Sequence, residues 1–178
     1  MRLENKIALI TGSARGIGEA TAKLFYKEGA IVIISGIRDK EGTRLANRLG
    51  ANAEYMHLDV SLESNWIAVA EAITEKYGRL DVLVNNAGIG SLTTVEKETD
   101  EVWHKVLNIN VVGTARVSRA AIPLLRQSKH ATIVNTASVA AIDGIPNRAA
   151  YSASKGAILA LTLAMATDHL SDGIRVNA

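Results

Sequence analysis

Unbroken apolar runs recur along the chain, and longer stretches with helical spacing of apolar residues separate them. Strands that are buried on both faces of a parallel sheet typically lack polar alternation. The runs predict six strands, at residues 7–10, 31–34, 55–58, 80–84, 133–134 and 174–176. Strands that alternate with helices form βαβ units, so the pattern predicts a doubly wound, Rossmann-like parallel α/β sheet.

The segments between these runs predict five helices. The first is expected to carry Ile17, Ala20, Leu24 and Phe25 on its packed side and to end at Gly29. A second helix is expected at residues 40–49, and a third from an N-cap at Ser61 to Gly78. A fourth should run from an N-cap at Thr99 towards Leu125, with Pro123 near its end, and a fifth is expected at 151–169. No repeat or linker interrupts the series, so we expect one domain over residues 1–178.

The composition narrows the function classes. The chain has 178 residues, a net charge of +2 and no run of basic residues, so nothing favours binding to nucleic acid or an anionic membrane. It has no cysteine, and its histidines lack ligand spacing, so no metal site is expected. The longest apolar stretch, residues 157–166, is too short for a bilayer, and the first strand leaves no room for a signal peptide. We therefore expect a cytoplasmic protein.

A glycine-rich turn, Thr11-Gly-Ser-Ala-Arg-Gly-Ile-Gly18, follows the first predicted strand and opens the first helix. Glycines let the backbone approach a pyrophosphate closely, and exposed N–H groups at a helix start attract an anion. The spacing Gly-x-x-x-Gly-x-Gly differs from the Gly-x-Gly-x-x-Gly of many dehydrogenases. The turn predicts a dinucleotide site with contacts from Gly12, Ser13, Arg15, Gly16, Ile17 and Gly18.

The residues after the second predicted strand bear on which dinucleotide binds. An acidic residue at this place would bind the adenosine 2′-hydroxyl and repel a 2′-phosphate. The strand ends at Gly36 without a carboxylate, although Asp39 lies just beyond it. Arg15 and Arg38 are within reach of a 2′-phosphate, which suits guanidinium groups, or they simply face solvent. We favour NADP(H) over NAD(H).

Tyr151-Ser-Ala-Ser-Lys155 lies at the start of the last predicted helix. Residues four apart share a helix face, so Tyr151 and Lys155 are expected to project side by side. An adjacent ammonium favours the phenolate and should lower the tyrosine pKa from its usual value of about 10, which would suit a general acid/base. Ser138, just past the fifth strand, is placed to orient a carbonyl oxygen beside Tyr151. Without neighbouring motifs, such a Tyr–Lys pair is usually a solvated helix face.

In this order and spacing, the motifs resemble the short-chain dehydrogenase/reductase family. They are the turn 11–18, Asp59-Val60, Asn85-Asn-Ala-Gly88, Asn110 in Asn-Val-Val-Gly113, Ser138, and Tyr151-x-x-x-Lys155. The match runs along almost the whole chain. The resemblance implies an NAD(P)-dependent oxidoreductase that interconverts a secondary alcohol and a ketone.

The resemblance also implies a catalytic tetrad of Asn110, Ser138, Tyr151 and Lys155. Tyr151 would exchange a proton with the substrate oxygen while hydride passes to or from the nicotinamide, and Ser138 would position that oxygen. Lys155 would hold the nicotinamide ribose, and Asn110 would support a water that links Lys155 to solvent. Further cofactor contacts would come from Asp59 and Val60 beside the adenine and from Asn85, Ala87 and Gly88 beside the sheet.

Family members pair helices of neighbouring subunits in a four-helix bundle, which implies a homodimer or homotetramer here. An alanine-rich face on the last predicted helix, residues 149, 153, 157, 160 and 164, would allow close helix approach. Family members also continue past the sixth strand into a lid segment and a seventh strand. The chain is therefore expected to lack the C-terminal part of the family's domain.

The substrate is open at this point. Arg148 lies three residues before Tyr151 and would suit a carboxylate, which suggests a hydroxy acid or sugar acid. An exposed arginine in a polar loop is the alternative. A second interpretation is a 3-oxoacyl thioester reductase, and a third is a non-catalytic nucleotide-binding or scaffold protein.

Overall fold

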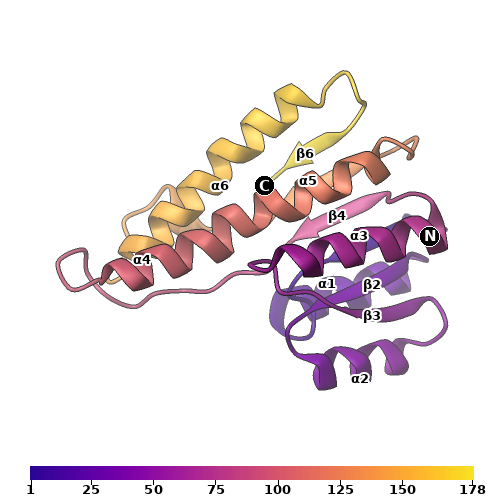
Figure 1. The fold of residues 1–178 in the computed structure, drawn as a ribbon, viewed down its shortest axis with the longest axis horizontal. Helices are drawn as coiled ribbons and strands as arrows, with labels where there is room; N and C mark the ends of the chain where they lie inside the picture. The colour runs from indigo at the N-terminus through magenta and orange to yellow at the C-terminus, as the bar shows by residue number, and fades with distance from the viewer.

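The computed structural model describes residues 1–178 and contains a six-stranded, all-parallel sheet (Figure 1). Its strands are β1 Ile7–Ile10, β2 Ile31–Gly36, β3 Ala53–His57, β4 Val82–Asn85, β5 Thr132–Asn135 and β6 Arg175–Asn177. They lie in the order β3-β2-β1-β4-β5-β6, so the winding direction changes between β1 and β4. Ligands of such sheets bind at this switch point, outside the carboxyl ends of the strands. The predicted doubly wound α/β class is confirmed.

The two faces of the sheet are covered by separate sets of helices. The helices are α1 Gly16–Lys27, α2 Asp39–Leu49, α3 Glu63–Tyr77, α4 Asp100–Leu107, α5 Gly113–Leu125 and α6 Ala149–Asp168. Ile7 and Leu9 of β1 pack in a core with α3, α5 and α6, whereas Ala8 and Ile10 pack with α1 and α2. Alternate residues of a strand face opposite sides, so both sets are buried and the run is apolar without interruption.

The packed side of α1 differs from the prediction. Ile17, Ala20 and Leu24 are exposed, whereas Phe25 is partly buried against the core as expected. The residues that the helix buries fully are Gly18 and Ala22. Helical spacing identifies an apolar stripe but does not decide whether that stripe faces the sheet or solvent.

Most element boundaries lie within one or two residues of their predicted positions, but the start of α3 has a different cap. The helix begins at Glu63 after Leu62, so the expected N-cap at Ser61 is wrong. The Ser61 hydroxyl and N–H instead donate to Asp59 Oδ1, at 2.6 and 2.9 Å. This local turn competes with capping for the serine hydroxyl.

The long helix expected between Thr99 and Leu125 contains an irregular turn. α4 and α5 form one continuous rod in Figure 1, and a π-helical turn, Asn108–Val112, joins them. Such a turn inserts one residue into the helix and often marks a functional site. Asn110, an expected site residue, lies in its middle.

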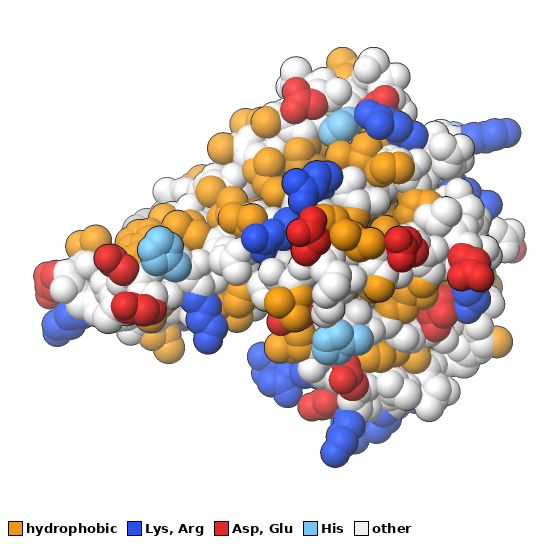
Figure 2. Space-filling view, viewed as in Figure 1, with side chains coloured by type: hydrophobic (Ala, Val, Ile, Leu, Met, Phe, Trp, Pro, Cys, Tyr) orange, Lys and Arg blue, Asp and Glu red, His pale blue; other side chains and the backbone are white.

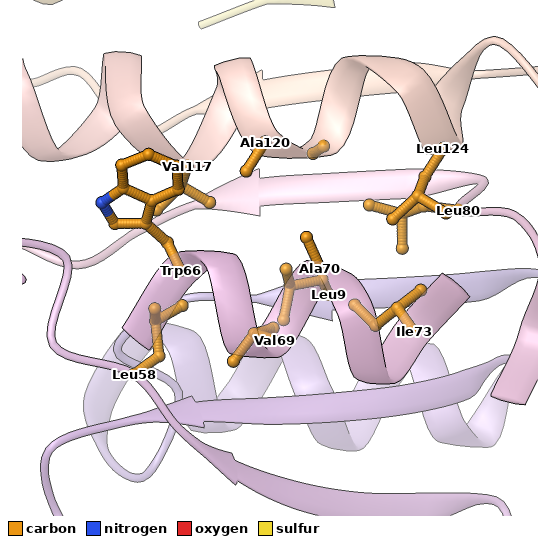
Figure 3. Close-up of a pocket in the computed structure, with 11 residues that line it drawn as sticks. Leu9, Leu58, Trp66, Val69, Ala70, Ile73, Leu80, Val117, Ala120 and Leu124 are labelled. Carbon is orange, nitrogen blue, oxygen red and sulfur yellow. The ribbon is translucent and has the colours of Figure 1, made fainter. Parts of the chain in front are cut away.

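A cavity of about 10 Å³ lies between α3 and α5 over the sheet, and only hydrophobic residues line it. Figure 3 shows Ala70 of α3 and Ala120 of α5 pointing into it, with Trp66 at one end. A void without polar groups does not hold an ordered water. Because no expected site residue lines it, we interpret it as imperfect core packing.

By length and composition alone, α6 would be able to cross a bilayer. The helix is longer than the stretch 157–166 on which the sequence expectation rested. It buries Ser154, Lys155, Ile158, Thr162 and Met165 within the fold. A core helix of a soluble protein passes the same test, so this single helix is weak support for a membrane protein.

Candidate active site

The glycine turn between β1 and α1 lies close against the segment that follows β4. Gly12 and Gly16 have φ values of +64° and +60°, which favour glycine. A Cβ on Gly12 would lie 2.9 Å from Ala87 Cα, and one on Gly18 would lie 2.6 Å from Asn86 Nδ2. α1 begins without a side-chain cap from Arg15, which leaves its first N–H groups available to an anion. The turn therefore fits a dinucleotide pyrophosphate.

The side chains of Thr11 and Asn86 hold this turn in place by hydrogen bonds to the backbone. Thr11 Oγ1 accepts from the N–H groups of Asn86 and Ala87, both at 2.9 Å. The Asn86 amide donates to the carbonyl oxygens of Thr11 and Gly12, at 2.9 and 3.1 Å. Sequence reasoning assigned neither side chain to the site, although both lie inside the matched motifs.

The Ser13 hydroxyl is turned away from the expected anion site. It is fully buried, donates to the Ile10 carbonyl at 2.6 Å and accepts from the Ser35 N–H at 3.0 Å. The Ser13 N–H also donates to the Ser35 carbonyl, at 2.9 Å, so both the hydroxyl and this N–H are already engaged within the protein.

Asn85 is also an interior residue. Its amide donates to Ser118 Oγ at 3.0 Å and to Asn135 Oδ1 at 2.9 Å, and the Asn135 amide donates to Thr162 Oγ1 at 2.9 Å. The side chain thus joins β4 and β5 to α5 and α6 rather than lying against a ligand. This agrees with the expected support of the sheet, and a cofactor contact by Asn85 stays a prediction.

Tyr151 and Lys155 lie on one face of α6, as the spacing predicts. Lys155 Nζ is 5.8 Å from the centroid of the Tyr151 ring and donates to the Thr136 carbonyl just after β5. Lys155 is only 6% exposed, and burial lowers the pKa of its ammonium group. Gly88 lies close to this pair and leaves room for Asn110, because a Cβ on Gly88 would lie 3.2 Å from Asn110 Oδ1.

Asn110 links α6 to the segment after β4. Its Oδ1 accepts from the Ile89 N–H at 2.8 Å, and its amide donates to the Ile89 carbonyl and to Ser154 Oγ, both at 2.9 Å. The Ser154 hydroxyl in turn donates to the Tyr151 carbonyl at 2.7 Å. Both amide hydrogens of Asn110 are engaged by protein, so a water beside Lys155 would need another donor.

Ser138 lies three residues past β5, as expected. Its Oγ accepts from the Ala140 N–H at 3.2 Å at the start of a short 3₁₀ turn, Val139–Ala141. The hydroxyl hydrogen is therefore free to donate to another oxygen.

Arg148 lies beside Tyr151, with its guanidinium carbon 5.7 Å from the ring centroid. One nitrogen, Nη1, donates to the Ser91 carbonyl at 3.2 Å, so the side chain helps to hold the loop after β4. Its remaining N–H groups make no hydrogen bond within the protein.

Glu98 is a buried carboxylate beside this site that sequence reasoning missed. It is 9% exposed, its Oε2 accepts from the Ala150 N–H at 3.4 Å, and its Oε1 has no partner. Acidic residues are mostly exposed, so its position before a predicted helix cap gave no signal of burial.

Both basic and acidic side chains lie where the adenosine half of a dinucleotide is expected to bind. Arg38 pairs with Glu41 at 3.2 Å, whereas the Arg15 side chain is exposed and makes no ion pair or hydrogen bond. Asp39 is held at the turn by two side chains of β3, Tyr55 and His57.

The segment after β3 lies where the adenine contacts were expected. The Asp59 carboxylate is engaged by Ser61, and Val60 packs against α5. A Cβ on Gly113 would lie 2.7 Å from Val60 Cγ2. Elsewhere, no group of three or more His, Cys, Asp or Glu side chains is placed to hold a metal ion.

The chain matches the model of the short chain dehydrogenase family over residues 6–178. It is 38% identical to cyclopentanol dehydrogenase of Comamonas sp., covering 99% of this chain and 72% of that protein. It is 38% identical to meso-2,3-butanediol dehydrogenase of Serratia marcescens, covering 100% and 71%. It is 39% identical to the 3-oxoacyl-[acyl-carrier-protein] reductase FabG of Thermotoga maritima, covering 100% and 74%.

The order of strands, the glycine turn and the polar residues on α6 agree with this match. The chain therefore belongs to the short-chain dehydrogenase family and is an NAD(P)-dependent oxidoreductase.

Proposed function

We propose that the protein interconverts a secondary alcohol and a ketone, with Tyr151 as the group that exchanges the proton. The observation that carries this proposal is the arrangement of Tyr151, Lys155 and Ser138 near the carboxyl ends of β4 and β5. A dinucleotide held at the glycine turn would supply the hydride chemistry. Two of the named relatives, which act on cyclopentanol and 2,3-butanediol, support an alcohol as substrate.

Each member of the expected tetrad has a distinct task in this proposal. Ser138 donates its free hydroxyl hydrogen to the substrate oxygen, and Tyr151 takes or returns the proton at that oxygen. Lys155 holds a positive charge beside the Tyr151 ring, and the Thr136 carbonyl orients its ammonium group. Asn110 acts indirectly, because its contacts with Ile89 and Ser154 position α6.

Replacing Tyr151 with phenylalanine tests the proton role. The ring remains while the proton carrier is lost, so we expect kcat to fall by about 10²–10⁴-fold with little change in the Kd of the dinucleotide. Tyr26→Phe on α1 serves as the matched control and should retain activity. Full activity in Tyr151→Phe would contradict the proposal.

We propose NADP(H) as the preferred cofactor, with Arg15 and Arg38 as the groups that receive the 2′-phosphate. The exposed, unpaired Arg15 side chain at the start of α1 supports this preference. Arg38 would have to exchange its surface contact with Glu41, and exposed ion pairs of this kind are weak.

For the substrate, we propose a hydroxy acid or sugar acid, that is, an alcohol with a nearby carboxylate that pairs with Arg148. The position of Arg148 beside Tyr151 supports this class. A 3-oxoacyl thioester is the second candidate, because a relative of 39% identity is named as a reductase of that class. Activity on acetoacetyl thioesters with NADPH would favour the second candidate, whereas nucleotide binding without any turnover would favour a non-catalytic role.

We further propose a homodimer or homotetramer in the cytoplasm, built on α5 and α6. Figure 2 shows hydrophobic side chains gathered over these two helices. Ala153, Ala160, Leu163 and Ala164 form an exposed stripe of small and apolar residues on α6. A groove between the helices runs beside this stripe and is lined in part by Ile122 of α5, Leu161 and Met165.

A further inference from the structure

The start of α6 has no cap from its own sequence. The helix begins at Ala149, and Arg148 before it makes no capping hydrogen bond with its side chain. The first N–H groups of a helix have no partner within the helix. The donors directly before Tyr151 therefore need acceptors from another part of the chain.

The loop at residues 91–98, within the connection between β4 and α4, supplies these acceptors. The Thr93 carbonyl accepts from the Ala149 N–H, and Glu98 Oε2 accepts from the Ala150 N–H, each at 3.4 Å. A carboxylate at this place also faces the positive end of the helix dipole. One loop thus holds the two residues that precede the expected proton carrier.

The burial of Glu98 works against the stability of the fold. The residue is 9% exposed, and its Oε1 has no hydrogen-bond partner within the protein. Moving a carboxylate out of water is costly unless its oxygens are paired, and an apolar side chain of similar size would avoid this cost. A buried, half-paired carboxylate beside reacting residues indicates a role in the site.

Tyr151 depends more on the start of α6 than its partner Lys155 does. Tyr151 is the third residue of the helix, and helix ends open more easily than helix interiors. Lys155 lies one turn further in, where it is buried and donates to the Thr136 carbonyl. A change in the first turn therefore moves the tyrosine hydroxyl while the lysine stays in place.

We propose that Glu98 is a positioning residue for the reaction. By accepting the Ala150 N–H, its carboxylate fixes the first turn of α6 and thereby the place of the Tyr151 hydroxyl beside the substrate oxygen. The inference rests on the proposed function, in which Tyr151 exchanges the proton. Because its side chain is buried, Glu98 acts through the helix and not by touching the substrate.

Glu98→Leu tests this inference, since it removes the acceptor and keeps a side chain of similar size. A displacement of about 1 Å costs on the order of 10²-fold in rate, so we expect kcat per folded molecule to fall by about 10–100-fold. The Kd for NADPH, measured by calorimetry, should stay nearly unchanged. Glu98→Gln keeps an oxygen acceptor of the same reach and should retain kcat close to that of wild type.

Hydrogen exchange on the protein alone gives a readout that does not depend on turnover. The peptide with residues 149–152 should exchange faster in Glu98→Leu than in wild type, and Glu98→Gln should restore the protection. Glu96→Leu is the matched control, because it makes the same substitution at an exposed position of the same loop. It should behave as wild type in every measurement.

Wild-type kcat in folded Glu98→Leu, or an equal loss in Glu98→Leu and Glu98→Gln, would overturn the inference. If Glu98→Leu does not fold, Glu98→Asp replaces it, since its shorter carboxylate withdraws from the Ala150 N–H and should lower kcat in the same way. Loss of folding in both variants would mean a structural role only and would overturn the inference.

The same experiments separate this inference from the proposed function. An inactive Tyr151→Phe together with a fully active Glu98→Leu would overturn the inference alone. A fully active Tyr151→Phe would overturn the proposed function and the inference with it.

Discussion

Lys155 places a positive charge in a buried position, with a carbonyl oxygen rather than a carboxylate as its partner. Burial lowers the pKa of this ammonium group, so between that lowered pKa and about 10.4 the unfolded chain binds more protons than the folded one. The free energy of unfolding therefore rises with pH across this window through Lys155. The site contains a charge that works against stability at neutral pH.

We predict that Lys155→Met abolishes this contribution. Through Lys155, the unfolding free energy of wild type rises with pH from about 7 towards 10.4, and the variant lacks this rise. The unfolding free energy of Lys155→Met minus that of wild type should therefore fall across this range. Urea unfolding at several pH values measures it, with the exposed Lys40→Met as control. The variant should also lose activity. A difference that does not vary with pH would contradict the effect of burial.

Arg148 is the second residue whose side chain invites a test at this scale. If its free N–H groups receive a substrate carboxylate, Arg148→Leu should raise KM for hydroxy acids by about tenfold or more and leave KM for neutral alcohols nearly unchanged, since charge-assisted hydrogen bonds contribute roughly 1.5–3 kcal/mol. Steady-state kinetics on matched acid and alcohol pairs measures this. Equal increases for both classes would mean that Arg148 only holds the loop through Ser91.

At the scale of elements, the contact between Gly113 at the start of α5 and Val60 after β3 is closely fitted. We predict that Gly113→Ala destabilises the protein by about 1–3 kcal/mol, because the new methyl group overlaps the Val60 side chain. Val60→Ala in the same chain should restore part of this loss. Chemical unfolding of the two single variants and the double variant gives the coupling. Strict additivity would show that the two positions do not compete for space.

The elements were predictable where one physical cause dominates. The run Ile7–Ile10 identified a buried parallel strand because both of its faces are covered. Three of the four residues assigned to the packed side of α1 face solvent and only Phe25 packs against the core, since spacing alone does not orient a helix. The π-helical turn around Asn110 was not predictable, because it depends on tertiary hydrogen bonds such as the one between Asn110 and Ile89.

The candidate site shows the same division. The motifs located the turn, Ser138 and the Tyr151–Lys155 pair, because their spacing along the chain is itself the signal. Motif membership did not tell which side chains face a ligand, and Ser13 is directed into the interior. The burial of Glu98 and the partners of Asp39 arise from segments far apart in the sequence.

At the scale of the whole molecule, the exposed stripe on α6 predicts self-association. Leu163 is 72% exposed on this stripe, so Leu163→Glu should shift the protein from dimer or tetramer towards monomer, since a charge at the centre of an apolar interface is costly. Analytical ultracentrifugation measures the change. Leu24→Glu on α1, where Leu24 is 48% exposed on the other face of the sheet, is the matched control. A wild-type monomer would contradict the assembly.

The hydrogen bonds that Thr11 and Asn86 make across the switch point connect the two halves of the sheet through the protein's own groups. The backbone of the glycine turn is thereby preorganised, and a nucleotide that docks there loses little conformational entropy of the protein on binding. Thr11→Val would remove part of these hydrogen bonds and transfer that ordering cost to the binding step, so affinity would fall although the buried threonine hydroxyl is bonded to the backbone of Asn86 and Ala87.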